Sequence, residues 1–274
     1  SKHSLHDRVF INSKGYPTYE AKELALAEKR YNKYYPNKII HVVGKEQTEY
    51  FKVVFKAMEQ VVPESVGKSH HLVGGYLQLK GMKKMSSRLG NVIAGDQLLD
   101  QTEEKIQEIM AERDMGNKEE VARKVTGAVL KYAMLKSNIS QDVAFDMDSS
   151  VSMSGDSGPY LLYIVARIKS ILGKSKIKSK VKIPNVIESV EKQLLLKIAG
   201  FPEVTESASQ DLDPSKIARY LFDLAQSFNS FYDKCPVLKA EEDIKEFRLH
   251  LIELVEKVMV RGLDLLGVET VEKM

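Results

Sequence analysis

Hydrophobic positions near the start of the chain alternate between strand and helix patterns. The short apolar run at 9–11 predicts a strand, closed by turn-forming residues at 12–15. In 19–34 apolar side chains recur at helical spacing. The β-branched run 39–43 predicts a strand buried on both faces, as in a parallel sheet, and 48–62 again shows one apolar helical face. This alternation predicts an α/β layer.

The pattern changes after Gly74 and Gly75, where glycine-broken strands lead into a basic loop. From about residue 96 onward the spacing predicts almost only helices. The Asp-Pro step at 213–214 is typical of a helix start, and the Cys-Pro step at 235–236 of a stop. The polar stretch 146–158 is the expected boundary between an α/β part and an all-α part. The predicted helices span 118–137, 158–172, 184–199, 214–233 and 240–266.

Composition indicates a globular protein of roughly two domains. The 274 residues are 43% hydrophobic and 29% charged, which excludes a disordered or low-complexity chain. No stretch approaches the ~20 consecutive apolar residues that a membrane helix needs. The single cysteine, Cys235, excludes an intramolecular disulfide and a zinc site of paired cysteines, and fits a reducing, cytosolic setting. The net charge of +3 does not by itself indicate nucleic-acid binding.

The most informative segment is the basic loop, which carries Lys-Met-Ser-Ser-Arg at 84–88. Flexible cations and hydroxyls suit a polyphosphate, because they can follow charge that builds on phosphate in a transition state. On composition alone, a solvated basic loop is the more frequent explanation. The order of the residues, followed by Gly-Asn-Val at 90–92, resembles the Lys-Met-Ser-Lys-Ser signature of class I aminoacyl-tRNA synthetases in its Lys-Met-Ser-Ser/Thr-Arg form.

Further segments resemble the arginyl-tRNA synthetases, in the order of that family. Residues 142–171 resemble the family pattern in which an Asp-x-Asp run leads to Gly-Asn/Asp-x-x-Pro-Tyr-x-x-Tyr-x-x-Ala-Arg. Residues 217–238 are similar to the helix of the anticodon-binding domain that is named for its Asp-Ala-Leu-Arg motif. The ending resembles Leu-Leu-Gly-x-x-x-x-x-Glu-Arg-Met, with Lys273 in place of Arg. Near the start, 17–27 and 41–51 resemble the Tyr-x-x-(Arg-Asp)-Leu-Ala and Val-Val-Gly-x-x-Gln segments. The resemblance covers essentially the whole chain.

The resemblance implies a fold in two parts. Residues 1–148 are expected to form the C-terminal half of a Rossmann-like α/β class I catalytic domain, with the signature loop and connecting helices. Residues 149–274 are expected to form an all-α helical-bundle anticodon-binding domain. The family's upstream His-x-Gly-His-type motif does not occur in the 274 residues. The chain is therefore expected to be a fragment that is inactive alone and needs the missing N-terminal half of the same enzyme.

The resemblance also implies an activity, an arginine–tRNA ligase. With ATP and Mg²⁺ as cofactors, the whole enzyme would activate L-arginine and transfer it to tRNA(Arg) in the cytoplasm, with no membrane partner. Because Ser87 stands where many class I enzymes have a catalytic Lys, another cation must face the ATP phosphates, and Lys84 is the first choice. The implied catalytic residues are Lys84, Ser86, Ser87 and Arg88, and the implied ATP-binding residues are Lys83, Lys84 and Met85.

Two further groups of binding residues follow from the resemblance, and no metal ligands do. The arginine pocket falls on Tyr19, Glu23 and Gln47, a carboxylate with planar acceptors that suits the five donors of a guanidinium. Glu23 lies one helical turn after Tyr19, although Lys22-Glu23 replaces the family's usual Arg-Asp. The alternative is a surface Glu on an amphipathic helix. The residues implied in anticodon binding, by stacking or at its bases, are Tyr160, Tyr163, Tyr232 and Met274.

Alternatives remain for the whole chain and for single features. A cysteinyl enzyme shares the helical domain but uses a cysteine/histidine zinc site, which one cysteine disfavours. A non-catalytic tRNA-binding or assembly module derived from a synthetase would need neither the Lys-Met-Ser-Ser-Arg loop nor the arginine pocket. The lysines between 169 and 182 suit a solvated connector or a phosphate-contacting loop equally. His41, inside an apolar strand, is predicted to be a satisfied core histidine.

We expect Lys84→Ala, in the full-length enzyme, to lower the rate of arginine adenylation far more than it weakens arginine binding. Loss of a cation directed at phosphate costs on the order of 2–4 kcal/mol of barrier, because its charge matters most in the transition state. Steady-state ATP–pyrophosphate exchange measures both parameters. An unchanged kcat with a raised KM for arginine would contradict this role.

Overall fold

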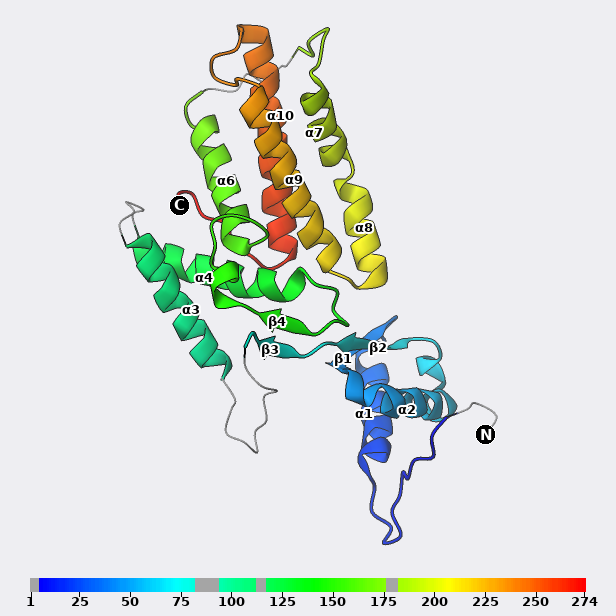
Figure 1. Cartoon of the computed structure of the whole chain (residues 1–274). Helices are drawn as coiled ribbons and strands as arrows, with labels where there is room; N and C mark the ends of the chain where they lie inside the picture. Colours follow the sequence, from blue (N-terminus) through cyan, green and yellow to red (C-terminus); the bar gives the residue numbers. More distant parts are fainter. Residues whose placement is uncertain (1–4, 82–93, 112–116, 176–181) are drawn as a thin grey trace. The chain divides into compact units, whose positions relative to one another are not determined.

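The protein is described by a computed structural model (Figure 1), which covers residues 5–81, 94–111, 117–175 and 182–274. It contains two compact units. Unit 1 comprises the described residues up to Tyr76, together with Ile139–Asp142. Unit 2 comprises those of Leu77–Asn138 and Val143–Met274. The predicted boundary between residues 148 and 149 separates two domains of the family, and these domains differ from the two compact units described here. The boundary therefore stays a prediction.

Unit 1 is a small α/β layer. Strands β1 (Ile39–Gly44) and β2 (Ser69–Gly74) are paired in parallel, with Ile39 opposite Ser69. Helices α1 (Tyr19–Tyr34) and α2 (Thr48–Val61) pack on each other, and α2 also packs on β2. Short 3₁₀ turns, η1 (Lys45–Gln47) and η2 (Pro63–Ser65), precede and follow α2. The helix–strand–helix order predicted from residue 19 to residue 62 is confirmed.

Two predictions for unit 1 are wrong. Only one face of β1 is covered by the described residues: His41 packs against the α2 rings, whereas Ile40 and Val42 on the opposite face are 39% and 62% exposed. Both helices lie on the same side of the sheet, so the run is not buried on both faces. Residues 9–11 do not form a strand. Ile11 makes an isolated bridge to Pro17, and no described strand pairs with this segment.

Unit 2 begins with a second parallel strand pair and two helices. Strand β3 (Leu77–Leu79) pairs with β4 (Val143–Phe145), and α3 (Gly95–Met110) packs on α4 (Lys118–Leu135). The one-turn helix α5 (Met147–Ser150) follows β4. The expectation of almost only helices after residue 96 holds for the described residues, with β4 as the exception. A three-residue strand is too short to show a period in its hydrophobic pattern.

The remainder of unit 2 is a helical bundle whose long helices run side by side in Figure 1. Of the five helices predicted after residue 96, four are confirmed to within a few residues: α4, α6, α9 and α10. The helix predicted at 184–199 begins only at Ser189, and α3 and α8 were not among the five. Pro202 occupies the first turn of α8, where a missing N–H costs nothing. The bundle helices are α6 (Gly158–Leu172), α7 (Ser189–Ala199), α8 (Phe201–Asp211), α9 (Ser215–Lys234) and α10 (Glu242–Leu265).

A buried ion pair joins α7 to α10 inside the bundle. The Nε of Arg248 lies 2.6 Å from Oε1 of Glu191, and an Arg248 amino group donates to the carbonyl oxygen of Pro236 at 2.7 Å. The second oxygen of Glu191 accepts the backbone N–H of Glu188 at 2.8 Å, which closes the capping box of α7. Both charges are buried and partnered, which is the condition under which such a pair is tolerated in a core. No described helix is both long and apolar enough to cross a membrane.

We expect Arg248→Ala to lower the free energy of unfolding of the helical bundle by about 3–5 kcal/mol, because Glu191 would remain buried and unpaired. Urea unfolding followed by far-ultraviolet circular dichroism measures this loss. Lys257→Ala, which removes an exposed cation from α10, is the control and should cost about 0.5 kcal/mol or less. A loss below about 1 kcal/mol for Arg248→Ala would show that the pair does not hold α7 on α10.

Candidate functional site

The residues predicted for the arginine pocket lie at the N-terminal ends of α1 and α2. Tyr19 is the exposed first residue of α1, and Glu23 follows one turn later with its side chain largely covered. Gln47 is the exposed N-cap residue of α2. The hydroxyl of Tyr50, in the first turn of α2, donates to the carbonyl oxygen of Tyr19 at 3.5 Å and so joins the two helix ends. Tyr19 and Glu23 on α1 and Gln47 at the start of α2 therefore lie on neighbouring elements of unit 1.

The carboxylate of Glu23 already contacts a guanidinium of the protein. An amino group of Arg30, two turns along α1, donates to Oε1 of Glu23 at 2.9 Å. Sequence reasoning missed Arg30, although its spacing of seven residues from Glu23 places both on one face of the helix. The pair shows that this carboxylate lies where it can accept a planar N–H donor. Within the part of the chain that the structure describes, its other oxygen, Oε2, accepts no hydrogen bond.

His41 lies next to this carboxylate in the core of unit 1. Its ring is tilted against the rings of Phe51 and Phe55, with centroid distances of 5.1 and 5.0 Å. Burial lowers the pKa of His41, and the nearby charge of Glu23 only partly opposes this effect. The Nε2 atom is buried without a hydrogen-bond partner among the described residues. The prediction of a core histidine is confirmed, but the expectation that its polar atoms are satisfied is wrong.

A polar network crosses the carboxyl ends of β1 and β2, where open parallel sheets usually bind ligands. Asp142 accepts from the Lys45 ammonium at 3.0 Å and from the backbone N–H of Tyr76 at 2.9 Å. The Tyr76 hydroxyl donates to Glu46 at 2.6 Å, which lowers the pKa of Glu46 and raises that of Tyr76. These bonds hold η1, whose last residue is Gln47. The sequence placed Asp142 in a motif but did not show its partners.

The signature loop lies outside the described residues. This applies to all the residues that the resemblance assigns to catalysis and ATP binding: Lys83, Lys84, Met85, Ser86, Ser87 and Arg88. On its N-terminal side, Lys80 pairs with Asp146 at 2.5 Å, which raises the pKa of Lys80 and lowers that of Asp146. Within the described residues, no group of three or more His, Cys, Asp or Glu side chains is placed to hold a metal ion.

Three of the four residues predicted to bind the anticodon meet in one pocket of unit 2. Tyr163 on α6, Tyr232 on α9 and Met274 at the C-terminus line a cavity of about 760 Å³, called here the tyrosine pocket. The guanidinium carbon of Arg167 lies 4.5 Å from the ring centroid of Tyr232. Arg167, Lys169, Lys174 and Lys273 also line the pocket. Aromatic rings among cations are the combination that binds single-stranded nucleic acid.

Tyr160 differs from its prediction as a stacking residue. The residue is only 9% exposed and its ring packs edge-on against Phe222, so little of it is open to a base. Burial raises the pKa of Tyr160. Its hydroxyl accepts from the amide of Asn229 at 2.9 Å, and the amide oxygen of Asn229 accepts from Arg167 at 3.5 Å. Tyr160 therefore supports the pocket through Asn229, a residue that sequence reasoning missed because no local pattern marks it.

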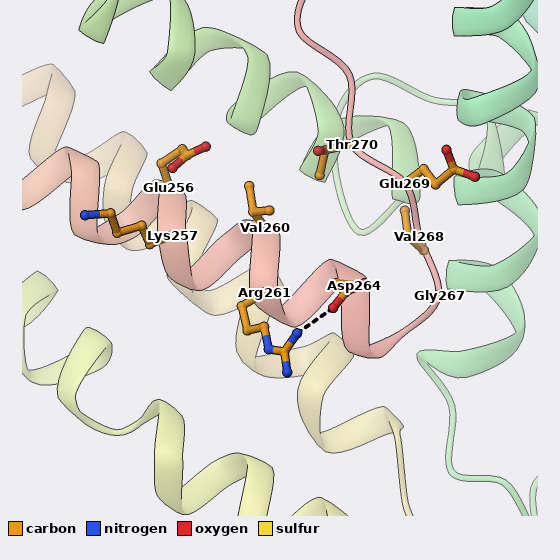
Figure 2. A pocket seen from close by; sticks show the side chains of 9 residues that line it. All are labelled: Glu256, Lys257, Val260, Arg261, Asp264, Gly267, Val268, Glu269 and Thr270. Atoms are coloured by element: carbon orange, nitrogen blue, oxygen red, sulfur yellow. Dashed lines mark hydrogen bonds and ion pairs between the residues drawn. The ribbon is translucent and has the colours of Figure 1, made fainter.

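A second pocket of about 500 Å³ lies in unit 2 between α10 and the segment that follows it (Figure 2). Its charged side chains belong mainly to α10, where Arg261 pairs with Asp264 at 2.7 Å. Lys257, also in its wall, pairs with Glu253 at 2.7 Å. It contains none of the predicted site residues and no aromatic side chain. The tyrosine pocket is therefore the stronger candidate for RNA binding in unit 2.

Comparison with known proteins gives one family for both parts of the chain. Residues 3–147 match the catalytic domain of class I tRNA synthetases of the arginine type, and residues 161–274 match the DALR anticodon-binding domain. The arginine–tRNA ligase of Clostridium perfringens is 33% identical over 272 residues, which are 97% of this chain and 48% of that protein. That of Halobacterium salinarum is 34% identical, over 96% of this chain and 42% of the relative.

The solved structures agree with the sequence comparison. The arginyl-tRNA synthetase of Thermus thermophilus superimposes with a TM-score of 0.88 and 28% identity, covering 97% of this chain and 51% of that protein. The chain thus spans about half the length of the relatives it matches. The catalytic-domain match takes in more than half of the chain and is followed by the anticodon-binding match, in the order expected from the sequence. The chain belongs to the class I arginyl-tRNA synthetase family.

Proposed function

We propose that this chain forms the tRNA-binding and loop-bearing half of an arginine–tRNA ligase. The proposed enzyme uses ATP, with Mg²⁺, to activate L-arginine and passes the arginyl group to tRNA(Arg) in the cytoplasm. The observation that carries the proposal is the tyrosine pocket, since Tyr163, Tyr232 and Met274 come from three separate segments and meet in one basic cavity. A chain that spans about half of its relatives is proposed to act together with an N-terminal half.

The tyrosine pocket is proposed to bind bases of the anticodon loop. Tyr163 is 36% exposed, and Tyr232 carries the Arg167 guanidinium over its ring, so both can contribute to stacking. RNA loops are recognised by stacking of unpaired bases on aromatic and guanidinium planes, together with hydrogen bonds to base edges. The pocket also contains Lys174 and Lys273, whose ammonium groups can contact phosphate. Tyr160 is proposed to position Asn229 and Arg167 rather than to stack.

The α1–α2 region of unit 1 is proposed to bind the side chain of arginine. Glu23 supplies a carboxylate in a half-buried setting, with Oε1 on Arg30 and Oε2 proposed for the substrate guanidinium. Tyr19 and Gln47 supply planar acceptors at the adjoining helix ends. The network of Asp142, Lys45 and Tyr76 supports this arrangement by holding η1. ATP is proposed to meet the loop at Lys83, Lys84 and Met85, with Ser86, Ser87 and Arg88 completing the charge and hydroxyl set.

We expect Tyr163→Ala and Tyr232→Ala to weaken binding of an anticodon stem-loop RNA by roughly 5- to 100-fold, because stacking is worth roughly 1–3 kcal/mol per base. Fluorescence anisotropy with a labelled stem-loop of arginine tRNA measures this effect on the 274-residue chain. Tyr34→Ala, which removes an exposed tyrosine of unit 1, is the control and should leave RNA affinity unchanged. Tyr160→Ala should instead lower the melting temperature, since a buried aromatic costs about 3 kcal/mol or more. Normal RNA binding by both pocket variants would refute the anticodon site.

We expect Glu23→Gln to raise the KM for arginine by roughly 10- to 100-fold in ATP–pyrophosphate exchange by the full-length enzyme. A hydrogen bond to an ionised group contributes about 1.5–3 kcal/mol, and the neutral amide loses that charge. The KM for ATP should remain unchanged. Glu28→Gln, which removes an exposed carboxylate from the same helix, is the matched control. Equal effects of the two substitutions would show that Glu23 acts only through the general charge of α1.

A further inference from the structure

The chain reverses sharply after α10, and its last residues return along the bundle. Gly267 adopts a φ of +68°, a left-handed conformation that favours glycine. The N–H of Val268 donates to the carbonyl oxygen of Leu263 at 2.9 Å, and that of Gly267 to Asp264 at 2.8 Å. This is the Schellman pattern of a helix end. Residues 266–274, called here the C-terminal tail, therefore leave α10 in a defined direction (Figure 2).

The apolar side chains of the C-terminal tail are buried in unit 2, whereas its acidic side chains are exposed and form ion pairs. Val268 and Val271 are buried in the core of unit 2 and hold the first part of the tail. Glu269 and Glu272 point to solvent, yet each carboxylate meets a lysine of another helix. Glu269 lies 3.8 Å from Lys124 of α4, and Glu272 lies 2.6 Å from Lys169 of α6. The tail is thus attached by its apolar residues and by ion pairs.

The Lys169–Glu272 pair lies in the wall of the tyrosine pocket. Both residues line the cavity, together with Met274 two positions further along. The Lys169 side chain is largely covered, so its ammonium has little freedom, whereas that of Glu272 is 83% exposed. Beyond Val271, this pair is the recorded polar contact that ties the tail to α6. Met274 itself packs against the apolar core of unit 2, so the pair adds a polar contact two residues before that apolar one.

Glu272 stands out by its charge. Among the described residues that line the tyrosine pocket, it is the one acidic side chain, beside Arg167, Lys169, Lys174 and Lys273. A carboxylate at the edge of an RNA site repels phosphate, so removing it should strengthen binding if it had no other role. Its close pairing with Lys169 both neutralises this charge and fixes the tail. The arrangement indicates a structural role for the acid rather than a direct contact with RNA.

We propose that the Lys169–Glu272 ion pair holds the C-terminal tail on α6 and so positions Met274 as a wall of the RNA-binding pocket. The inference rests on the proposed function, in which this pocket binds the anticodon loop. Lys169 and Glu272 are positioning residues, because they act through Met274. The alternative is that Lys169 contacts an RNA phosphate directly and that Glu272 merely competes for it.

Substitution of Glu272 separates these two roles by the sign of the effect. We expect Glu272→Gln to weaken binding of the labelled anticodon stem-loop by the 274-residue chain about three- to fivefold, as an ion pair near the surface contributes up to about that factor. Direct contact by Lys169 predicts tighter binding for the same variant. Lys169→Glu should weaken binding more strongly, and the exchanged pair Lys169→Glu with Glu272→Lys should return affinity to within about twofold. Unchanged or tighter binding by Glu272→Gln, where Tyr232→Ala does weaken binding, would overturn the proposal.

A second measurement tests, without RNA, how firmly the tail is held on the bundle. Carboxypeptidase should release Met274 several-fold faster from Glu272→Gln and Lys169→Ala than from the parent chain, and the exchanged pair should slow the release again. Lys105→Ala, which breaks an ion pair within α3 away from the pocket and the tail, should change neither release nor RNA binding. Release at the parent rate from both variants would refute the positioning role. If release rises but Tyr232→Ala and Glu272→Gln bind RNA normally, the tail contact stands and the RNA site fails.

Discussion

The close contact between the start of α6 and the backbone of α4 is the constraint on which the helical unit depends. A Cβ atom at Gly158 would lie 2.2 Å from the carbonyl oxygen of Ala128, so only glycine permits this approach. One turn further along α4, the buried hydroxyl of Tyr132 donates to Asp156 at 2.6 Å and lies 3.2 Å from the carbonyl oxygen of Ala218. Burial and these partners keep the phenol neutral by raising its pKa. Together they fix where α6 begins relative to α4 and α9.

The tyrosine pocket is a consequence of that fixed start. Once α6 is placed, its helical repeat sends the stripe of Leu161, Ile164 and Ile168 into the core and leaves Tyr163 and Arg167 on a different face. The opposite wall comes from Tyr232 on α9, and the closing wall from the tail after α10. Because α6, α9 and α10 pack on one another, the walls of the cavity are carried by elements of the helical bundle.

In unit 1, polar contacts rather than a large hydrophobic core hold the region proposed to bind arginine. Its core is small, and the carboxyl ends of β1 and β2 are joined by the ion pair of Lys45 with Asp142 and by the bond of Tyr76 to Glu46. Gly75 lies so near the carbonyl oxygen of Gln141 that a Cβ would clash at 1.9 Å. The segment 139–142 therefore completes unit 1, although it lies far along the chain.

The sequence by itself determined the features that depend on neighbours along the chain. Helical periodicity predicted α1 and α6, the β-branched run predicted β1, and the ordered motifs predicted the family. Only the tertiary structure decided which distant residues meet: Glu191 with Arg248, 57 positions apart, and Tyr163 with Tyr232 and Met274. It also decided that Tyr160 is buried and that Nε2 of His41 has no hydrogen-bond partner among the described residues. Burial and long-range pairing are set by helix packing and loop closure, which involve the whole chain at once and leave no periodic mark on any one segment.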